Sequence, residues 1–136
     1  MSIQFTMPAS RRSFVRALAA LAAVAGIGTT GVRAQSRRDF AVVARRYTYT
    51  VTGNDRAEIR VMQNDLVHVT FSSEDIPHSF TIEEAPYRIM RRAEPGKPVV
   101  FNFRADAPGR FRFFCNLTAD DGCRELQGTL VVEASR

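Results

Sequence analysis

The chain has 136 residues and a formal net charge of +5, with 45% hydrophobic and 24% charged residues. Four of its 19 basic residues lie within residues 1–34, so the remaining 102 residues carry 15 basic and 14 acidic side chains, a net charge of +1. This near-neutral balance excludes nucleic-acid binding driven by charge, and 102 residues suffice for one domain with a single core but not for two.

The first 34 residues have the pattern of a twin-arginine export signal. Two consecutive arginines, Arg11 and Arg12, precede an apolar run over residues 17–27. That run is shorter than the about 20 apolar residues that a membrane span needs. The small residues that a signal peptidase requires occur at Val32-Arg33-Ala34, so we expect cleavage after Ala34 and a periplasmic or otherwise exported domain of residues 35–136. The alternative is an uncleaved N-terminal anchor.

Short apolar runs rich in β-branched and aromatic residues, separated by turn residues, fill the rest of the chain. None shows sustained helical periodicity. We therefore predict an all-β fold, a Greek-key β-sandwich of about eight strands, with a mobile lead-in at residues 35–39. The predicted strands cover residues 40–51, 57–61, 66–72, 78–82, 87–90, 99–104, 110–115 and 128–132.

Strand alternation predicts which side chains form the core. Successive side chains of a strand point to opposite faces, so Val67, Val69 and Phe71 share one face while His68 lies on the other. We expect the first face to be buried and His68 to lie on the surface. The pattern recurs at residues 110–113, where two arginines alternate with two phenylalanines.

Three side chains of the predicted domain have the chemistry of a metal or redox site. Cys115 ends a predicted strand, Cys123 follows a loop of seven residues, and His78 begins another strand. In an oxidising compartment two such cysteines are bridged, bound to metal or redox active. The twin-arginine route exports proteins that are already folded, often with a cofactor installed, which favours metal over a disulfide.

These segments resemble the cupredoxins, and within them the copper domain of cytochrome oxidase subunit II and the periplasmic cupredoxin-like proteins. The family holds copper between a histidine at a strand start and a loop that supplies a cysteine, a histidine and often a methionine. The segment from Asp75 to Phe80 matches the first element and Cys115 the second, so the resemblance implies that His78 and Cys115 are copper ligands. The sequence departs where Cys123 replaces the histidine and Leu126 the methionine.

The departures change the kind of copper site that we expect. A binuclear centre of the oxidase type needs a second cysteine where this chain has Ala119. An ordinary blue site needs two imidazoles and one thiolate, but the chain has two histidines and His68 is expected on the surface. We therefore predict a mononuclear site at His78, Cys115 and Cys123 for one copper ion per chain, with Cu(I) favoured and zinc as the competitor.

The fourth ligand and the state of the two thiols stay open at this point. Glu125, Asp120 and Asp121 are candidate oxygen ligands. A disulfide between Cys115 and Cys123 would instead close a short loop and stabilise the fold by about 2–3 kcal/mol on the chain-entropy estimate.

Three functions follow from these alternatives. Single-electron transfer, which the resemblance implies, is the first; a Cu(I) carrier or buffer is the second; and a disulfide-stapled interaction module without metal is the third. No nucleophile with a base and an orienting partner is visible, so we do not expect an enzyme. The expected partners are a copper ion and a protein that exchanges electrons or metal with the chain, with no nucleic acid and no stable membrane insertion after signal cleavage.

Overall fold

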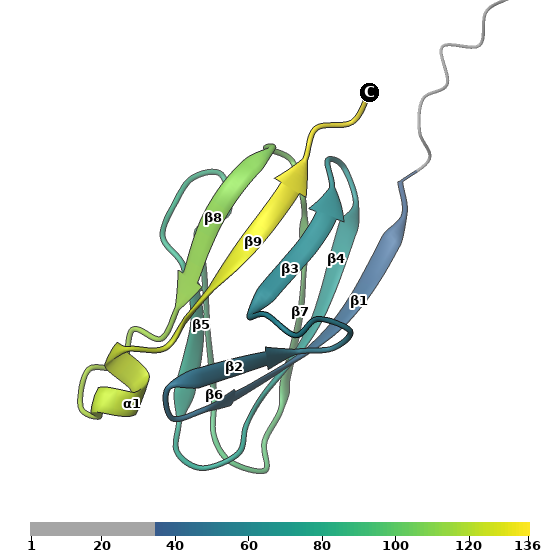
Figure 1. Ribbon diagram of the computed structural model, residues 1–136. Coiled ribbons are helices and arrows are strands. Elements are labelled where there is room, and N and C mark those ends of the chain that lie inside the picture. Colours follow the sequence, from purple (N-terminus) through teal and green to yellow (C-terminus); the bar gives the residue numbers. More distant parts are fainter. Residues whose placement is uncertain (1–34) are drawn as a thin grey trace, which may run out of the picture. The chain divides into compact units, whose positions relative to one another are not determined.

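The structure of the protein is a computed structural model that describes residues 35–136. The predicted export signal and its cleavage site lie outside the described residues. Figure 1 shows the elements of the described part, which are nine strands and one short helix. They are β1 (Arg37–Arg45), β2 (Thr48–Val51), β3 (Glu58–Met62), β4 (Leu66–Ser73), β5 (His78–Ile82), β6 (Ile89–Ala93), β7 (Val99–Arg104), β8 (Gly109–Phe114), α1 (Asp121–Arg124) and β9 (Gln127–Glu133).

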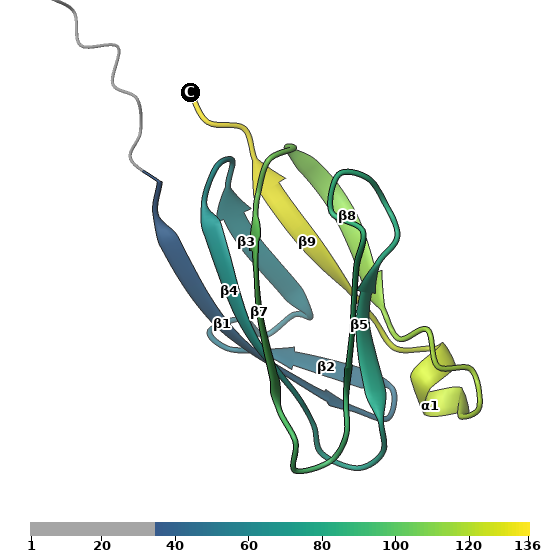
Figure 2. The same cartoon turned by 180° about the vertical axis from the view of Figure 1, so that it is seen from behind.

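The strands form two sheets, with the orders β2-β1-β4-β7 and β3-β9-β8-β5-β6. β1 pairs with β4 and β3 pairs with β9 in parallel, whereas the other named pairs are antiparallel. Five of the eight connections cross from one sheet to the other, so the two sheets enclose one core (Figures 1 and 2). The predicted all-β sandwich is confirmed.

Alternation along β4 places the core as the sequence predicts. Val67, Val69 and Phe71 are fully buried, and the residues between them are partly exposed. His68 lies on the outer face, where its Nδ1 is 2.6 Å from Oδ1 of Asn102 on β7. The predicted surface position of His68 is therefore confirmed.

Aromatic side chains join the two sheets inside the core. Phe80 of β5 stacks on Phe113 of β8 with ring centroids 4.6 Å apart, and Phe71 of β4 lies 6.0 Å from Phe80. Tyr49 of β2 meets Phe113 edge-on at 5.0 Å. Such pairs add about 0.5–1.5 kcal/mol each beyond the burial of their area. The Tyr49 hydroxyl donates to the carbonyl of Ser79, and burial raises the pKa of Tyr49.

The single strand predicted over residues 40–51 is wrong, because the chain reverses within it. β1 and β2 form a hairpin that turns at Arg46 and Tyr47, and Tyr47 has a φ of 69°. The turn holds no glycine, proline or asparagine, the residues that mark a reversal in a sequence. The mobile lead-in is also wrong from Arg37 onward, because Arg37 pairs with Leu66 and begins β1.

Two further differences concern the loops that flank the candidate site. The strand predicted over residues 87–90 lies instead at Ile89–Ala93, because the N–H groups of Tyr87 and Arg88 donate to the Glu84 carbonyl and close a turn. The loop after Cys115 contains α1, which Asp120 caps by accepting from the N–H of Gly122 at 2.8 Å.

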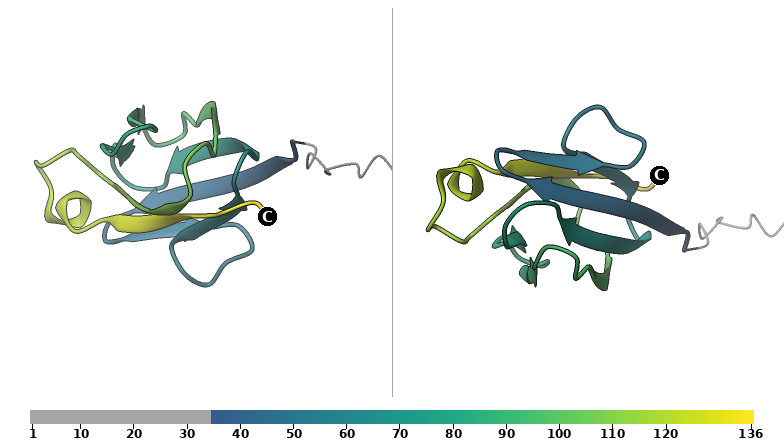
Figure 3. Two further views of the ribbon diagram at one scale, coloured as in Figure 1. Left: turned by 90° about the horizontal axis from the view of Figure 1, so that it is seen from above. Right: turned by 90° about the horizontal axis from the view of Figure 1, so that it is seen from below.

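The helix α1 lies at the end of the sandwich remote from the C-terminus (Figure 3). Within residues 35–136, no helix is both long and apolar enough to cross a membrane.

A pair of substitutions in β4 tests the assignment of its faces. Phe71→Ala removes a fully buried ring and leaves a cavity, so we expect the free energy of unfolding to fall by about 3–5 kcal/mol. Thr70→Ala, its neighbour on the outer face, should change that free energy by no more than about 0.5 kcal/mol. Urea denaturation followed by circular dichroism measures both, and equal effects would contradict the assignment.

Candidate metal centre

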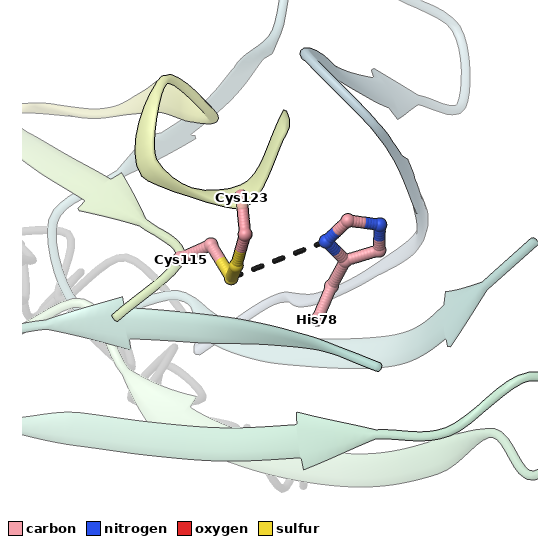
Figure 4. Close-up of side chains that lie close together, drawn as sticks. All are labelled: His78, Cys115 and Cys123. Carbon is pink, nitrogen blue, oxygen red and sulfur yellow. Dashed lines mark hydrogen bonds between the residues drawn. A yellow bond between two sulfur atoms is a disulfide. The ribbon is translucent and has the colours of Figure 1, made fainter. Parts of the chain in front are cut away.

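Two strands and the short helix bring the three predicted ligands together. His78 is the first residue of β5, and Cys115 follows the last residue of β8, with which β5 pairs through Thr81 and Phe114. Cys123 lies in α1. The ligand atoms of the three residues all lie within 4.8 Å of one another, and the distance from His78 Nδ1 to Cys115 Sγ is 4.0 Å (Figure 4).

All three side chains are buried, and the two cysteines are bonded to each other. The exposed fractions are 0% for His78, 4% for Cys115 and 1% for Cys123. A disulfide joins Cys115 and Cys123, with the His78 ring beside it (Figure 4). The structure thus has the bridged state, one of the alternatives that the sequence left open. Metal binding by both sulfurs requires that this bond first be reduced.

The carboxylate of Asp75 orients the imidazole of His78. Burial alone would raise the pKa of Asp75, but hydrogen bonds from the backbone N–H groups of Arg46 and Ile76 and from His78 outweigh it and lower that pKa to about 2. An ionised carboxylate only accepts hydrogen bonds, so Nε2 of His78 donates to Asp75 Oδ1 at 2.7 Å. In neutral His78 the lone pair is then on Nδ1, the nitrogen that faces the sulfurs.

A small hydrogen-bond network holds Cys115 against β5. The backbone N–H of Ser79 donates to Cys115 Sγ at 3.3 Å. The Ser79 hydroxyl donates to Asn116 Oδ1 at 2.7 Å and accepts from the Asn116 N–H at 2.8 Å. Because Ser79 and Asn116 are the neighbours of His78 and Cys115 in the chain, this reciprocal pair fixes the separation of the two candidate ligands.

The β1–β2 turn contacts both loops that carry candidate ligands. The Arg46 N–H donates to Asp75 Oδ2 at 2.8 Å, on the side of His78. The Tyr47 N–H donates to the Gly122 carbonyl at 2.9 Å, on the side of Cys123, and the Arg46 side chain lies 3.3 Å from Asp120. The turn therefore sets the position of α1 relative to His78.

The carboxylates predicted as oxygen ligands do not join the group. Asp120 caps α1, and Asp121 forms an ion pair with Arg124. Glu125 is exposed and follows the helix. Among residues 35–136, the group of closely placed histidine, cysteine and carboxylate side chains consists of His78, Cys115 and Cys123.

The three residues suit a soft metal ion in size and chemistry. Two atoms bound to one metal at about 2.0–2.3 Å lie no more than about 4.6 Å apart, and these three all lie within 4.8 Å of one another, so a shift of a few tenths of an ångström brings them into range. The two sulfurs would have to separate after reduction. Two thiolates and an imidazole whose other nitrogen donates to a carboxylate form a donor set that binds Cu(I) or zinc.

Sequence reasoning found the three candidate ligands but missed the groups that position them. Asp75 belongs to the segment that resembles the cupredoxins, and its place three residues before His78 is the indication of its role that the sequence offers. Ser79 and Asn116 are 37 residues apart and carried no comparable indication. The contact of Arg46 with the site could not be predicted, because the β1–β2 hairpin itself was missed.

Comparison with known proteins gives matches to solved structures alone. No model of a known protein family matches the chain, and no curated protein matches it. A chain of a heme-copper terminal oxidase dimer matches with a TM-score of 0.62 and 23% identity, over 74% of this chain and 66% of that one, just under two thirds of its length. Auracyanin A, a blue copper protein from Chloroflexus aurantiacus, matches with a TM-score of 0.56 and 15% identity, over 72% of this chain and 100% of that one.

Two further matches involve subunit II of cytochrome oxidase. The periplasmic domain of that subunit from Bradyrhizobium japonicum matches with a TM-score of 0.60 and 14% identity, over 71% of this chain and 84% of that one. A chain from a mixed disulfide intermediate between a thioredoxin-like protein and subunit II of cytochrome c oxidase matches with a TM-score of 0.57 and 14% identity, over 71% of this chain and 81% of that one. These identities are low, so the likeness shows the fold: residues 35–136 form a cupredoxin-like β-sandwich.

A methyl group on Gly122 tests whether the β1–β2 turn positions α1. A Cβ built there would lie 2.6 Å from Cγ and 2.9 Å from Cα of Arg46, so Gly122→Ala must displace α1 or the turn. We expect the free energy of unfolding to fall by about 1–3 kcal/mol. Thr118→Ala, in the same loop but exposed, is the matched control and should have an effect within about 0.5 kcal/mol. Wild-type stability of Gly122→Ala in urea denaturation would show that the turn does not constrain α1.

Proposed function

We propose that residues 1–34 direct export by the twin-arginine route and that residues 35–136 then act in the periplasm as a Cu(I) carrier. In the reduced protein, His78, Cys115 and Cys123 bind one Cu(I) ion. The Cys115–Cys123 disulfide is the oxidised, metal-free state. The observation that carries the proposal is the convergence of one imidazole nitrogen and two sulfurs within 4.8 Å in a buried site.

The surroundings of the three residues favour a bound cation in the reduced state. Two thiolates buried together repel each other and lose their hydration, a cost that a metal ion or protonation removes. The Ser79 N–H accounts for one hydrogen bond to Cys115, and Asp75 keeps the lone pair of His78 directed at the sulfurs. Burial at 4% exposure or less keeps water from competing for the ion.

The proximity of the two sulfurs favours a carrier over repeated electron transfer. Formation of the Cys115–Cys123 bond from two thiolates releases two electrons, so a Cu(II) ion at the site accepts one of them as it becomes Cu(I) and a second Cu(II) ion from solution must accept the other. Two adjacent thiolates would therefore be lost as ligands wherever such a second oxidant is at hand, whereas a trigonal site with one thiolate cannot form this bond. Single-electron transfer is the second candidate function, and the fold shared with the blue copper protein auracyanin A favours it.

The carrier needs a reductant, and one of the structural neighbours suggests its class. Subunit II of cytochrome oxidase, whose periplasmic domain has this fold, has been captured in a mixed disulfide with a thioredoxin-like protein. We propose by analogy that a thiol reductant of this kind returns the Cys115–Cys123 disulfide to two thiols before copper binds. Reduction and metal binding are then consecutive steps at the same pair of sulfurs.

Metal analysis combined with a thiol count tests the proposal directly. Protein purified after export and reduced without air should contain two free thiols and take up one Cu(I) per chain, in preference to zinc. Cys115→Ser should abolish this uptake, because one thiolate and one imidazole are too few soft donors. His68→Ala, on the outer face of β4, is the control and should bind as the wild type does. Unchanged binding by Cys115→Ser would rule the site out.

Removal of the Asp75 carboxylate tests how the imidazole is oriented. In Asp75→Ala, His78 loses the acceptor of its Nε2–H, so Cu(I) affinity should fall by about 10–100-fold while the fold is kept. Asp39→Ala, which removes a carboxylate paired with Arg37 on β1, is the control for loss of charge. Competition with a chromophoric Cu(I) chelator measures the affinities, and equal values for the two variants would contradict this role of Asp75.

A further inference from the structure

A pocket of about 330 Å³ lies beside the disulfide. Its walls come from the loop before β5, from β6 and from the loop between β8 and α1, and we call it the cysteine pocket. Its walls are largely apolar, with one charged group of each sign, Arg92 and Asp120. Its apolar lining includes Ile76, Pro77, Leu117 and Ala119, and Cys123 also lines it.

The two sulfurs differ in their relation to this pocket. Cys123 is one of the residues that line it, whereas neither Cys115 nor His78 is among them. Cys115 Sγ instead contacts the Ser79 N–H at 3.3 Å and the His78 ring at 4.0 Å. Both cysteines are almost fully buried, so a reagent that attacks the disulfide needs a local opening, and the pocket provides one next to Cys123.

We infer that the cysteine pocket admits the thiolate of a partner protein and directs it to Cys123. The partner sulfur bonds to Cys123 Sγ, the Cys115–Cys123 bond breaks, and Cys115 leaves with the electron pair as a thiolate. A second thiolate of the partner then attacks the mixed disulfide, so the partner leaves as a disulfide and Cys123 as a thiolate. The inference rests on the proposed function, in which the disulfide is reduced before copper binds.

The surroundings of Cys115 favour it as the leaving sulfur. Thiol–disulfide exchange is faster when the charge on the departing sulfur is stabilised. The Ser79 N–H already points at Cys115 Sγ, so a hydrogen-bond donor is in place where the negative charge forms. The apolar walls at Ile76, Pro77 and Leu117 suit a partner that presents an apolar residue beside its cysteine.

Mapping the first mixed disulfide tests the direction of attack. Wild-type protein is treated with glutathione, quenched in acid at the earliest times and alkylated with N-ethylmaleimide. Trypsin cleaves after Arg112 and Arg124, so both cysteines lie in one peptide, residues 113–124, and fragmentation of that peptide assigns each label. We expect glutathione on Cys123 and N-ethylmaleimide on Cys115. The reverse pattern, or equal labelling of both cysteines at the earliest times, would overturn the inference.

A substitution that fills the cysteine pocket is a second test of whether a thiolate enters through it. Ala119 is an exposed residue that lines the pocket, so Ala119→Phe should slow reduction of the disulfide by glutathione by about tenfold. Val100→Phe, at a 58%-exposed position on β7, is the matched control and should react at the wild-type rate. Reduction of Ala119→Phe at the wild-type rate, in protein whose circular dichroism is unchanged, would overturn the inference.

Cu(I) binding by chemically reduced protein separates the two proposals. If reduced wild type binds one Cu(I) but glutathione first labels Cys115, the direction of attack is wrong and the carrier stands. If glutathione labels Cys123 but reduced protein does not bind Cu(I), the carrier is wrong and the direction of attack stands. A disulfide that no thiol reduces in the folded protein would overturn both.

Discussion

The hydrogen bonds of the Asp75 carboxylate connect the parts of the molecule on which the candidate site depends. One oxygen accepts from His78 Nε2 and the other from the Arg46 N–H of the β1–β2 turn. The same turn accounts for the position of α1, through the bond from Tyr47 to Gly122. A single carboxylate thus links the imidazole to the element that carries Cys123. Each of these bonds joins groups of the protein itself, so the fold holds the imidazole and α1 in place.

Cys115 and Cys123 can form a disulfide or exist as two thiolates, and the two states exclude each other. As a disulfide, Cys115 and Cys123 are bonded to each other and cannot both bind a metal; in the proposed function they bind a soft ion as thiolates, which requires a reductant. Phe80 of β5 stacks on Phe113 of β8, a contact that joins the two strands without involving either sulfur. The sandwich can therefore keep His78 in place while the bond between the sulfurs forms and breaks.

The sandwich could be predicted from the sequence, and so could the set of three residues that the structure brings together at the candidate site, because alternation along β4 and the motif around His78 are local patterns. The positioning groups could not be predicted in the same way. The reversal at Tyr47 uses a residue that rarely marks a turn, and the bonds between Ser79 and Asn116 join positions 37 residues apart. Such contacts depend on how strands pair across the sheet, which periodicity does not encode.

X-ray absorption spectroscopy of the Cu(I)-loaded protein tests the central claim most directly, because it identifies the atoms bound to the metal. If His78, Cys115 and Cys123 hold the ion, the first shell contains two sulfurs and one imidazole nitrogen. Substitution of Cys123 by serine should remove one of those sulfurs. A shell of nitrogen and oxygen alone, or one unchanged in Cys123→Ser, would contradict the account.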